Sequence, residues 1–95
     1  MKAELPLRER QALTTTAFAE MVVWRLRQPV PGSTHLFKYR LALITNGACV
    51  LRYDNESGKG DHKHVDGREV AGRYRDLAAL QEDFWRDVEA WESES

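Results

Sequence analysis

Cysteine is almost absent from this chain of 95 residues, in which Cys49 is the single thiol. A disulfide within the chain and a zinc site built from cysteines are therefore excluded. Long apolar runs are missing too, because none approaches the ~18 residues that a membrane-spanning helix needs. The N-terminal segment, with Glu4 and Arg8 around a proline, lacks the apolar core of a signal peptide. We therefore expect a cytoplasmic protein with no membrane partner.

A large excess of charge is also missing, since the formal net charge is −1. This total hides two opposite parts. Residues 1–75 carry 13 basic and 8 acidic side chains, whereas residues 76–95 carry one arginine and seven acids. A basic body is typical of proteins that bind polyanions such as RNA, because much of nucleic-acid affinity comes from phosphate neutralisation. The alternative interpretation is that the acidic tail covers its own basic body.

The length, with 42% hydrophobic residues, fits one compact domain over residues 1–95. Alternating apolar residues, many of them β-branched or aromatic, predict a long strand from Thr16 to Arg27. Shorter strands are expected before it, where Pro6 would confine the strand to a sheet edge, and later, over Glu69–Arg75. The proline-rich segment 28–33 cannot continue a ladder and predicts a loop.

The clearest local feature is the pair Asn46-Gly47, which suits the positive φ angles of a type I′ turn. Pairing Thr45 with Ala48 across this turn predicts a hairpin over residues 36–54 and divides its side chains between two faces. The expected core face carries Phe37, Tyr39, Leu41, Leu43, Val50, Arg52 and Asp54. The other face carries Lys38, Arg40, Ala42, Ile44, Cys49, Leu51 and Tyr53, and its strand ends form a basic and aromatic patch.

The apolar period becomes helical after Asp76, a good N-cap residue. The residues that recur at steps of three or four are Leu77, Leu80, Phe84, Val88 and Trp91. They predict an amphipathic helix over residues 76–92, whose apolar stripe packs on a sheet spanning residues 3–75. The expected fold class is α+β: a mostly antiparallel sheet of four or five strands, packed by one C-terminal helix.

The polar segment 55–68 is expected to be a long loop or an irregular sheet edge. In and around it stand the side chains best suited to chemistry, which are Tyr53, Asp54, Lys59, Asp61, His62, Lys63 and His64. Two histidines two positions apart present both imidazoles on one side of an extended segment. The set fits metal-free acid–base chemistry, a metal site or a solvated polar loop.

Four segments carry a resemblance to a known family. They are Glu20-Met-Val-Val-Trp-Arg-Leu26, Pro29-Val-Pro-Gly-Ser33, His35-Leu-Phe-Lys-Tyr-Arg-Leu41, and Tyr53-Asp-Asn-Glu56 continuing through Lys59-Gly-Asp-His-Lys-His64. In this order they resemble the TumE family of toxins from bacterial toxin–antitoxin pairs, and the last block is the most specific. The chain departs from the family at Ala71-Gly-Arg-Tyr74, where Pro-Tyr-x-Phe is usual. The resemblance implies a type II toxin encoded beside an antitoxin, often a helix-turn-helix protein.

The leading hypothesis is an endoribonuclease that inhibits growth. RNA supplies its own nucleophile, the 2′-hydroxyl, so a small protein needs only a base, an acid and a cation for the phosphate. We expect His62 and His64 to be base and acid in either order, and Asp54 or Asp61 to orient an imidazole. The remaining expected roles are phosphate binding by Lys59, base stacking or proton transfer by Tyr53, and nucleic-acid binding by Lys38, Arg40 and Lys63.

Two alternatives stay open beside this cofactor-free mechanism. In the first, His62, His64, Asp54 and Asp61 hold a divalent metal ion in a metal-dependent nuclease. The metal-free mechanism is favoured because the lysines of the segment would repel a dication. In the second, the toxin is not an enzyme and binds and blocks a cellular target, through the basic face of the sheet and the polar loop that carries the histidines. A homodimer is compatible with each of them.

Overall fold

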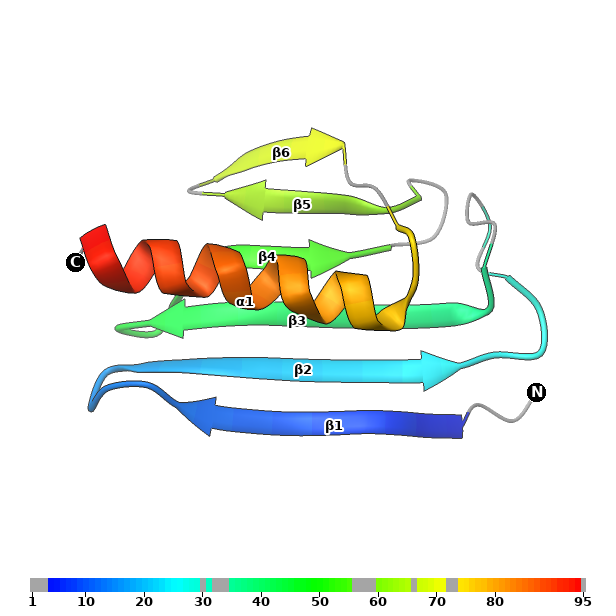
Figure 1. Ribbon diagram of the computed structural model, residues 1–95, viewed down its shortest axis with the longest axis horizontal. Helices are drawn as coiled ribbons and strands as arrows, with labels where there is room; N and C mark the ends of the chain where they lie inside the picture. The colour runs from blue at the N-terminus through cyan, green and yellow to red at the C-terminus, as the bar shows by residue number, and fades with distance from the viewer. Residues whose placement is uncertain are drawn as a thin grey trace.

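The structure, a computed structural model, describes residues 4–29, 31, 35–55, 60–65, 67–71 and 74–94. Six strands form one antiparallel sheet in chain order, and a helix lies across one face of it (Figure 1). The elements are β1 (Glu4–Ala12), β2 (Ala17–Arg25), β3 (Phe37–Thr45), β4 (Ala48–Asp54), β5 (His62–Val65), β6 (Arg68–Ala71) and α1 (Leu77–Glu94). The expected α+β fold is confirmed.

The sheet has six strands rather than the expected four or five. The additional strand is β5, which falls inside the segment 55–68 that was expected to be a loop or an irregular edge. Its sequence, His62-Lys63-His64-Val65, lacks the alternation of apolar and polar residues by which strands are recognised. A turn at Gly67, with φ of 80°, leads into β6. At the opposite edge lies β1, as Pro6 indicated.

The core lies between α1 and the sheet. Asp76 caps the helix, because its carboxylate accepts a hydrogen bond of 2.7 Å from the backbone N–H of Ala79. The helix buries Leu80, Phe84 and Val88. On the sheet, the buried residues that meet them include Met21, Val23, Leu41, Leu43 and Leu51. Within the described ranges, no helix has both the length and the apolar character needed to cross a membrane.

The hairpin between β3 and β4 has the expected turn, with Thr45 paired to Ala48. Asn46 and Gly47 have φ angles of 50° and 78°, as a type I′ turn requires. The register then shifts, because Ile44 pairs with Cys49 but Leu43 pairs with Leu51. Val50 is therefore the extra residue of a β-bulge.

This bulge overturns the predicted faces of β4. A shift of one residue exchanges the two faces of a strand. Leu51 and Tyr53 therefore join Leu43 on the face that α1 covers, whereas Arg52 and Asp54 move to the opposite face. The prediction that Arg52 and Asp54 belong to the core face was wrong, because a hairpin register extrapolated from the turn does not include a bulge. Val50, at the bulge itself, is partly buried and packs against the core, as expected.

The face opposite α1 is called the outer face below. The cross-strand pairs place several basic side chains on this face, together with side chains from the C-terminal end of β4 and from β5. Its charged, histidine and tryptophan side chains include Arg8, Arg10, Trp24, Lys38, Arg40, Arg52, Asp54, His62 and His64. Because Lys38 and Arg40 are exposed there, the positive charge of this face is accessible.

Candidate functional site on the outer face

Asp54, His62 and His64 meet on the outer face, where the end of β4 lies beside β5. Asp54 pairs directly with His62, and Arg52 pairs with His64. Because side chains alternate along a strand, both imidazoles point to the same side as the carboxylate. One ligand atom from each of the three residues lies within 4.8 Å of the other two. This cluster, called the Asp-His-His cluster below, joins three of the residues that the sequence singled out.

His62 is held from both sides of its ring. Its side chain is only 4% exposed, and Nδ1 lies 2.9 Å from the backbone carbonyl oxygen of Gly60. A carbonyl oxygen can only accept a hydrogen bond, so Nδ1 carries the proton that is donated. The other ring nitrogen, Nε2, faces Asp54 at 2.6 Å from Oδ1.

Four buried polar atoms of this region have no hydrogen bond in the described part of the chain. They are Nε2 of His62, Nε2 of His64, Oδ1 of Asp54 and Nε of Arg52. Two of these atoms, Nε2 of His62 and Oδ1 of Asp54, lie 2.6 Å apart and form an ion pair when the imidazole is protonated. Buried polar atoms without partners cost about 1–3 kcal/mol each. A water molecule, an ion or a substrate group bound at this place would satisfy these atoms.

Charges of both signs surround the cluster. Nε of Arg52 lies 2.7 Å from Oδ2 of Asp54, so the guanidinium is beside the oxygen that faces away from His62. Oε1 of Glu69, on β6, lies 3.7 Å from Nε2 of His62. The rings of His62 and His64 are 5.0 Å apart and meet edge to face.

A hollow of about 300 Å³ adjoins the cluster. Its lining is Trp24, Lys38, Tyr39, Arg40, Arg52, Asp54 and Asn55. The ammonium of Lys38 lies 5.9 Å from the centre of the Trp24 ring. Lys38 and Arg40 therefore lie near the Asp-His-His cluster, and the ring of Trp24 lies beside Lys38.

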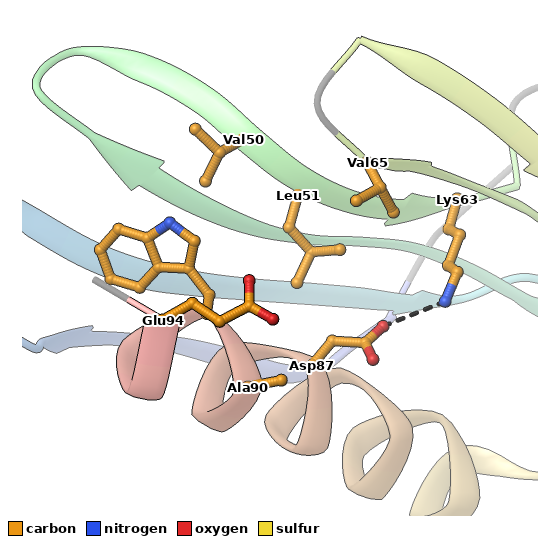
Figure 2. A pocket seen from close by; sticks show the side chains of 8 residues that line it. Val50, Leu51, Lys63, Val65, Asp87, Ala90 and Glu94 are labelled. Atoms are coloured by element: carbon orange, nitrogen blue, oxygen red, sulfur yellow. Dashed lines mark hydrogen bonds and ion pairs between the residues drawn. The ribbon is translucent and has the colours of Figure 1, made fainter.

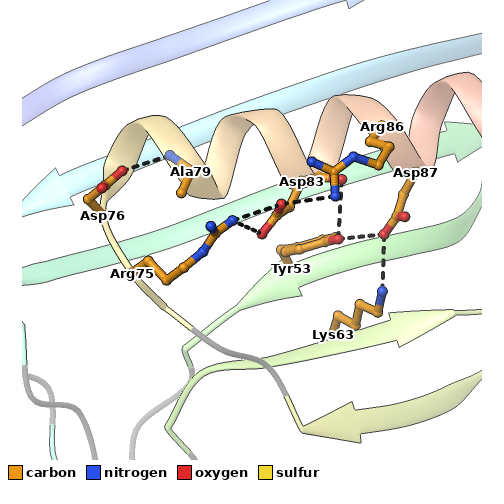
Figure 3. A network of polar contacts seen from close by, with 8 residues as sticks. All are labelled: Tyr53, Lys63, Arg75, Asp76, Ala79, Asp83, Arg86 and Asp87. Atoms are coloured by element: carbon orange, nitrogen blue, oxygen red, sulfur yellow. Dashed lines mark hydrogen bonds and ion pairs between the residues drawn. The ribbon is translucent and has the colours of Figure 1, made fainter.

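Tyr53 and Lys63, in contrast, lie on the face that α1 covers (Figure 3). The hydroxyl of Tyr53 donates to a carboxylate oxygen of Asp87, and Nζ of Lys63 lies 3.1 Å from the same oxygen. Burial and this hydrogen bond raise the pKa of Tyr53, so the phenol stays protonated. The sequence placed both residues with the histidines, but the structure uses them to tie β4 and β5 to α1.

The same ion pair borders a second hollow, of about 200 Å³, between the C-terminal half of α1 and the strands β4 and β5 (Figure 2). Val50, Leu51 and Val65 point toward the helix in this view. Because this hollow is on the helix side of the sheet, it is separate from the Asp-His-His cluster.

Asp61 belongs to another group of side chains. Its Oδ1 accepts hydrogen bonds of 2.6 Å from the hydroxyl of Tyr39 and 2.9 Å from Nε2 of His35. Nδ1 of His35 accepts from the backbone N–H of Phe37, so Nε2 is the protonated nitrogen. The ring of Tyr74 stacks on His35 at 3.7 Å. Asp61 therefore orients the imidazole of His35, whereas it was expected to orient that of His62 or His64.

Burial and the hydrogen bond to Asp61 raise the pKa of Tyr39 far above its usual value. Burial likewise raises the pKa of Tyr74. Both phenols are therefore neutral across the ordinary pH range and act as packing and hydrogen-bonding groups. Lys59, the expected phosphate ligand, lies outside the described residues.

Sequence reasoning missed Trp24, Arg52, Glu69 and Asn55 as neighbours of the site. Asn55 is buried, accepts from the backbone N–H of Tyr39 at 2.9 Å and donates to the carbonyl of Phe37 at 2.6 Å. The sequence did contain a signal for Arg52. Charged side chains are rarely buried unless they are paired, so placing Arg52 on the core face was already unfavourable. Trp24 and Glu69 could be found only with the strand pairing in hand.

Comparison with known proteins gives one finding. A family model described as Toxin TumE matches residues 2–92. Neither the curated proteins nor the solved structures that were compared give a match. The matched residues include all six strands, the Asp-His-His cluster and all but the last two residues of α1.

Proposed function

The chain belongs to the TumE toxin family, and on this premise we propose that it is a type II toxin that inhibits growth by cleaving RNA. The observation that carries the proposal is the Asp-His-His cluster, whose ligand atoms lie within 4.8 Å of one another beside a basic hollow. Acid–base groups and cations on one accessible face are what cleavage of a polyanion needs.

The proposed reaction uses the RNA 2′-hydroxyl as the nucleophile. One imidazole of the pair His62 and His64 takes the hydroxyl proton while the oxygen attacks the adjacent phosphorus. The other imidazole gives a proton to the departing 5′-oxygen, so that a cyclic phosphate and a free 5′-hydroxyl result. Asp54 positions His62, since the two groups are in contact at 2.6 Å.

RNA binding is assigned to the basic side of the same face. Lys38, Arg40 and Arg52 line the hollow next to Asp54 and can neutralise phosphates on either side of the cleaved bond. Trp24 offers a ring on which an unpaired base can stack. A single-stranded segment of RNA therefore fits this surface better than a rigid duplex.

The proposal includes an antitoxin as the natural partner, of the helix-turn-helix kind. A partner that covers the outer face would block access to the Asp-His-His cluster, and an acidic segment would complement Lys38 and Arg40. The exposed cations also support a second candidate, a toxin that binds its target without cleaving it.

The deciding experiment is controlled expression of the chain with and without the neighbouring gene, followed by sequencing of RNA ends. New 5′-hydroxyl ends that appear before growth stops, and that vanish with His64→Gln, are the result expected for a nuclease. Growth arrest with unchanged RNA ends would instead favour the binding toxin. Intact growth at a high level of the protein would contradict the toxin assignment for this chain.

A further inference from the structure

We infer that Asp54, His62 and His64 bind one divalent metal ion, such as zinc or manganese, between β4 and β5. The site follows from geometry alone, whereas its use in RNA cleavage rests on the proposed function. In the metal-bound chain His62 and His64 would be ligands, so metal-bound water would replace them as the group that takes up the 2′-hydroxyl proton. Three observations support the site: the donor set, the burial of its ligand atoms without hydrogen bonds, and the balance of charge around it.

The donor set suits such an ion. Imidazole nitrogens with a carboxylate oxygen bind zinc, manganese, cobalt and nickel, whereas magnesium and calcium prefer oxygen alone. In His62, the Nδ1–H bond to the carbonyl of Gly60 fixes the tautomer and leaves Nε2 as the ligand atom. A backbone acceptor behind a metal-binding histidine is the usual arrangement, since it orients the ring and makes its free nitrogen more basic.

The buried atoms without hydrogen bonds point to the same place. Nε2 of His62, Nε2 of His64 and Oδ1 of Asp54 are buried and have no hydrogen bond within the described segments, although the first and the last lie 2.6 Å apart. One ion satisfies all three atoms at once. Ligands at about 2.0–2.1 Å from a tetrahedral ion are about 3.3 Å apart. The 2.6 Å contact between His62 and Asp54 must therefore open slightly, and His64 must move toward them, both by side-chain rotation.

The balance of charge permits a dication. Arg52 is occupied with Oδ2 of Asp54, and Glu69 adds a second carboxylate at 3.7 Å from Nε2 of His62. Lys63 was expected to repel a metal ion, but its ammonium is on the other face of the sheet, paired with Asp87. Lys63 therefore does not oppose a metal ion at the cluster, contrary to the expectation from the sequence.

Three protein ligands leave coordination positions free. A bound ion of this class would supply positive charge for a phosphate oxygen and would lower the pKa of its own water. The hollow lined by Trp24 and Arg40 includes Asp54 in its lining, so a phosphate bound there would lie near the metal ligands.

The test uses the full chain, freed of metal by dialysis against a chelator. Zinc chloride and manganese chloride are titrated in by calorimetry, and cobalt(II) is added as a spectroscopic probe. The variants are Asp54→Asn and His64→Gln, which keep side-chain size. The matched control is His35→Gln, which alters another partly buried histidine that contacts an aspartate. Circular dichroism checks that each variant is folded.

We expect one zinc ion per chain, and a Tm raised by about 10 °C at a free zinc concentration of 100 times Kd. Affinity should fall by about 100-fold or more in Asp54→Asn and His64→Gln, and remain within about threefold in His35→Gln. Cobalt should give visible absorption bands that both site variants lose. Failure to bind zinc at millimolar concentration, or equal binding by all variants, would overturn the metal site.

The two proposals can fail separately. If zinc binds at the Asp-His-His cluster but no RNA is cleaved, the metal site is supported and the nuclease function is contradicted. If the chain binds no zinc and still cleaves RNA in excess chelator, the metal site is contradicted and the nuclease function is supported.

Discussion

Oδ1 of Asp54 and Nε2 of His62 lie 2.6 Å apart across β4 and β5, on the face of the sheet that α1 does not cover. This relationship depends on Val50, the extra residue of the bulge between β3 and β4. Without the bulge, the side chains of β4 would exchange faces, and β5 would follow because it pairs with β4. The carboxylate and the imidazole would then face the apolar helix. One additional residue therefore decides on which side the candidate site lies.

The bulge makes a prediction about stability. Leu51 is 5% exposed and packs under α1, so Leu51→Ala should lower the free energy of unfolding by about 2–4 kcal/mol. Val50→Ala should cost less than half as much, because Val50 is only partly buried. Urea unfolding followed by circular dichroism measures both. A larger loss in Val50→Ala would support the simple register that the turn predicts.

Tyr53 provides a prediction that depends on pH. Its hydrogen bond to Asp87 ties β4 to α1, so Tyr53→Phe should lower the free energy of unfolding by about 1 kcal/mol near neutral pH. The folded chain raises the pKa of this phenol, whereas in the unfolded chain it ionises at about 10. The stabilisation is therefore present below pH ~10 and is lost as the pH rises further.

The measurement is the difference in unfolding free energy between the wild type and Tyr53→Phe from about pH 8 to pH 11. This difference should shrink at the alkaline end, and the contributions of Tyr39 and Tyr74 cancel because both proteins contain them. RNA cleavage by Tyr53→Phe should stay near the wild-type rate. A cleavage rate lowered by more than tenfold in a folded Tyr53→Phe variant would mean that Tyr53 takes part in the reaction.

Trp24 is predicted to bind RNA through stacking. Removing its ring with Trp24→Ala should weaken the binding of single-stranded RNA by about 1–3 kcal/mol, whereas Trp24→Phe should keep most of the affinity. Fluorescence anisotropy with a labelled oligonucleotide measures this, at a fixed salt concentration. Equal affinity in Trp24→Ala and the wild type would mean that RNA does not use the hollow.

Elements specified by local signals could be predicted from the sequence. Asn46-Gly47 fixes the hairpin turn by its φ angles, and the spacing of Leu80, Phe84 and Val88 fixes the helix. The strand β5 has no comparable signal, because Lys63 is not an apolar residue, although it lies on the core side. Its ammonium is accommodated by Asp87 of α1, a partner that only the folded chain supplies.

The candidate site was predictable in its residue types but not in its grouping. Asp54 and Asp61 are equivalent in sequence, as carboxylates that flank two histidines. In the fold, Asp54 pairs with His62 across β4 and β5, whereas Asp61 is bonded to His35, which lies 26 residues before it. Such long-range contacts follow from strand register and loop closure, which neither motif spacing nor composition specifies.

His64 and His35 lie in different groups of side chains, and we expect a catalytic role for His64 and a structural role for His35. His64 belongs to the Asp-His-His cluster, and His35 stacks on Tyr74 and bonds Asp61. If the cluster cleaves RNA, His64→Gln should lower the cleavage rate by about 10²–10⁴-fold and leave the Tm nearly unchanged. His35→Gln should do the opposite: a Tm lowered by several degrees, with a rate within about threefold of the wild type. Rates are measured on purified protein at a temperature where both variants are folded. A wild-type cleavage rate in His64→Gln would mean that the Asp-His-His cluster does not catalyse the reaction. Equal losses of cleavage rate in both variants would mean that the effect of His64 comes from folding.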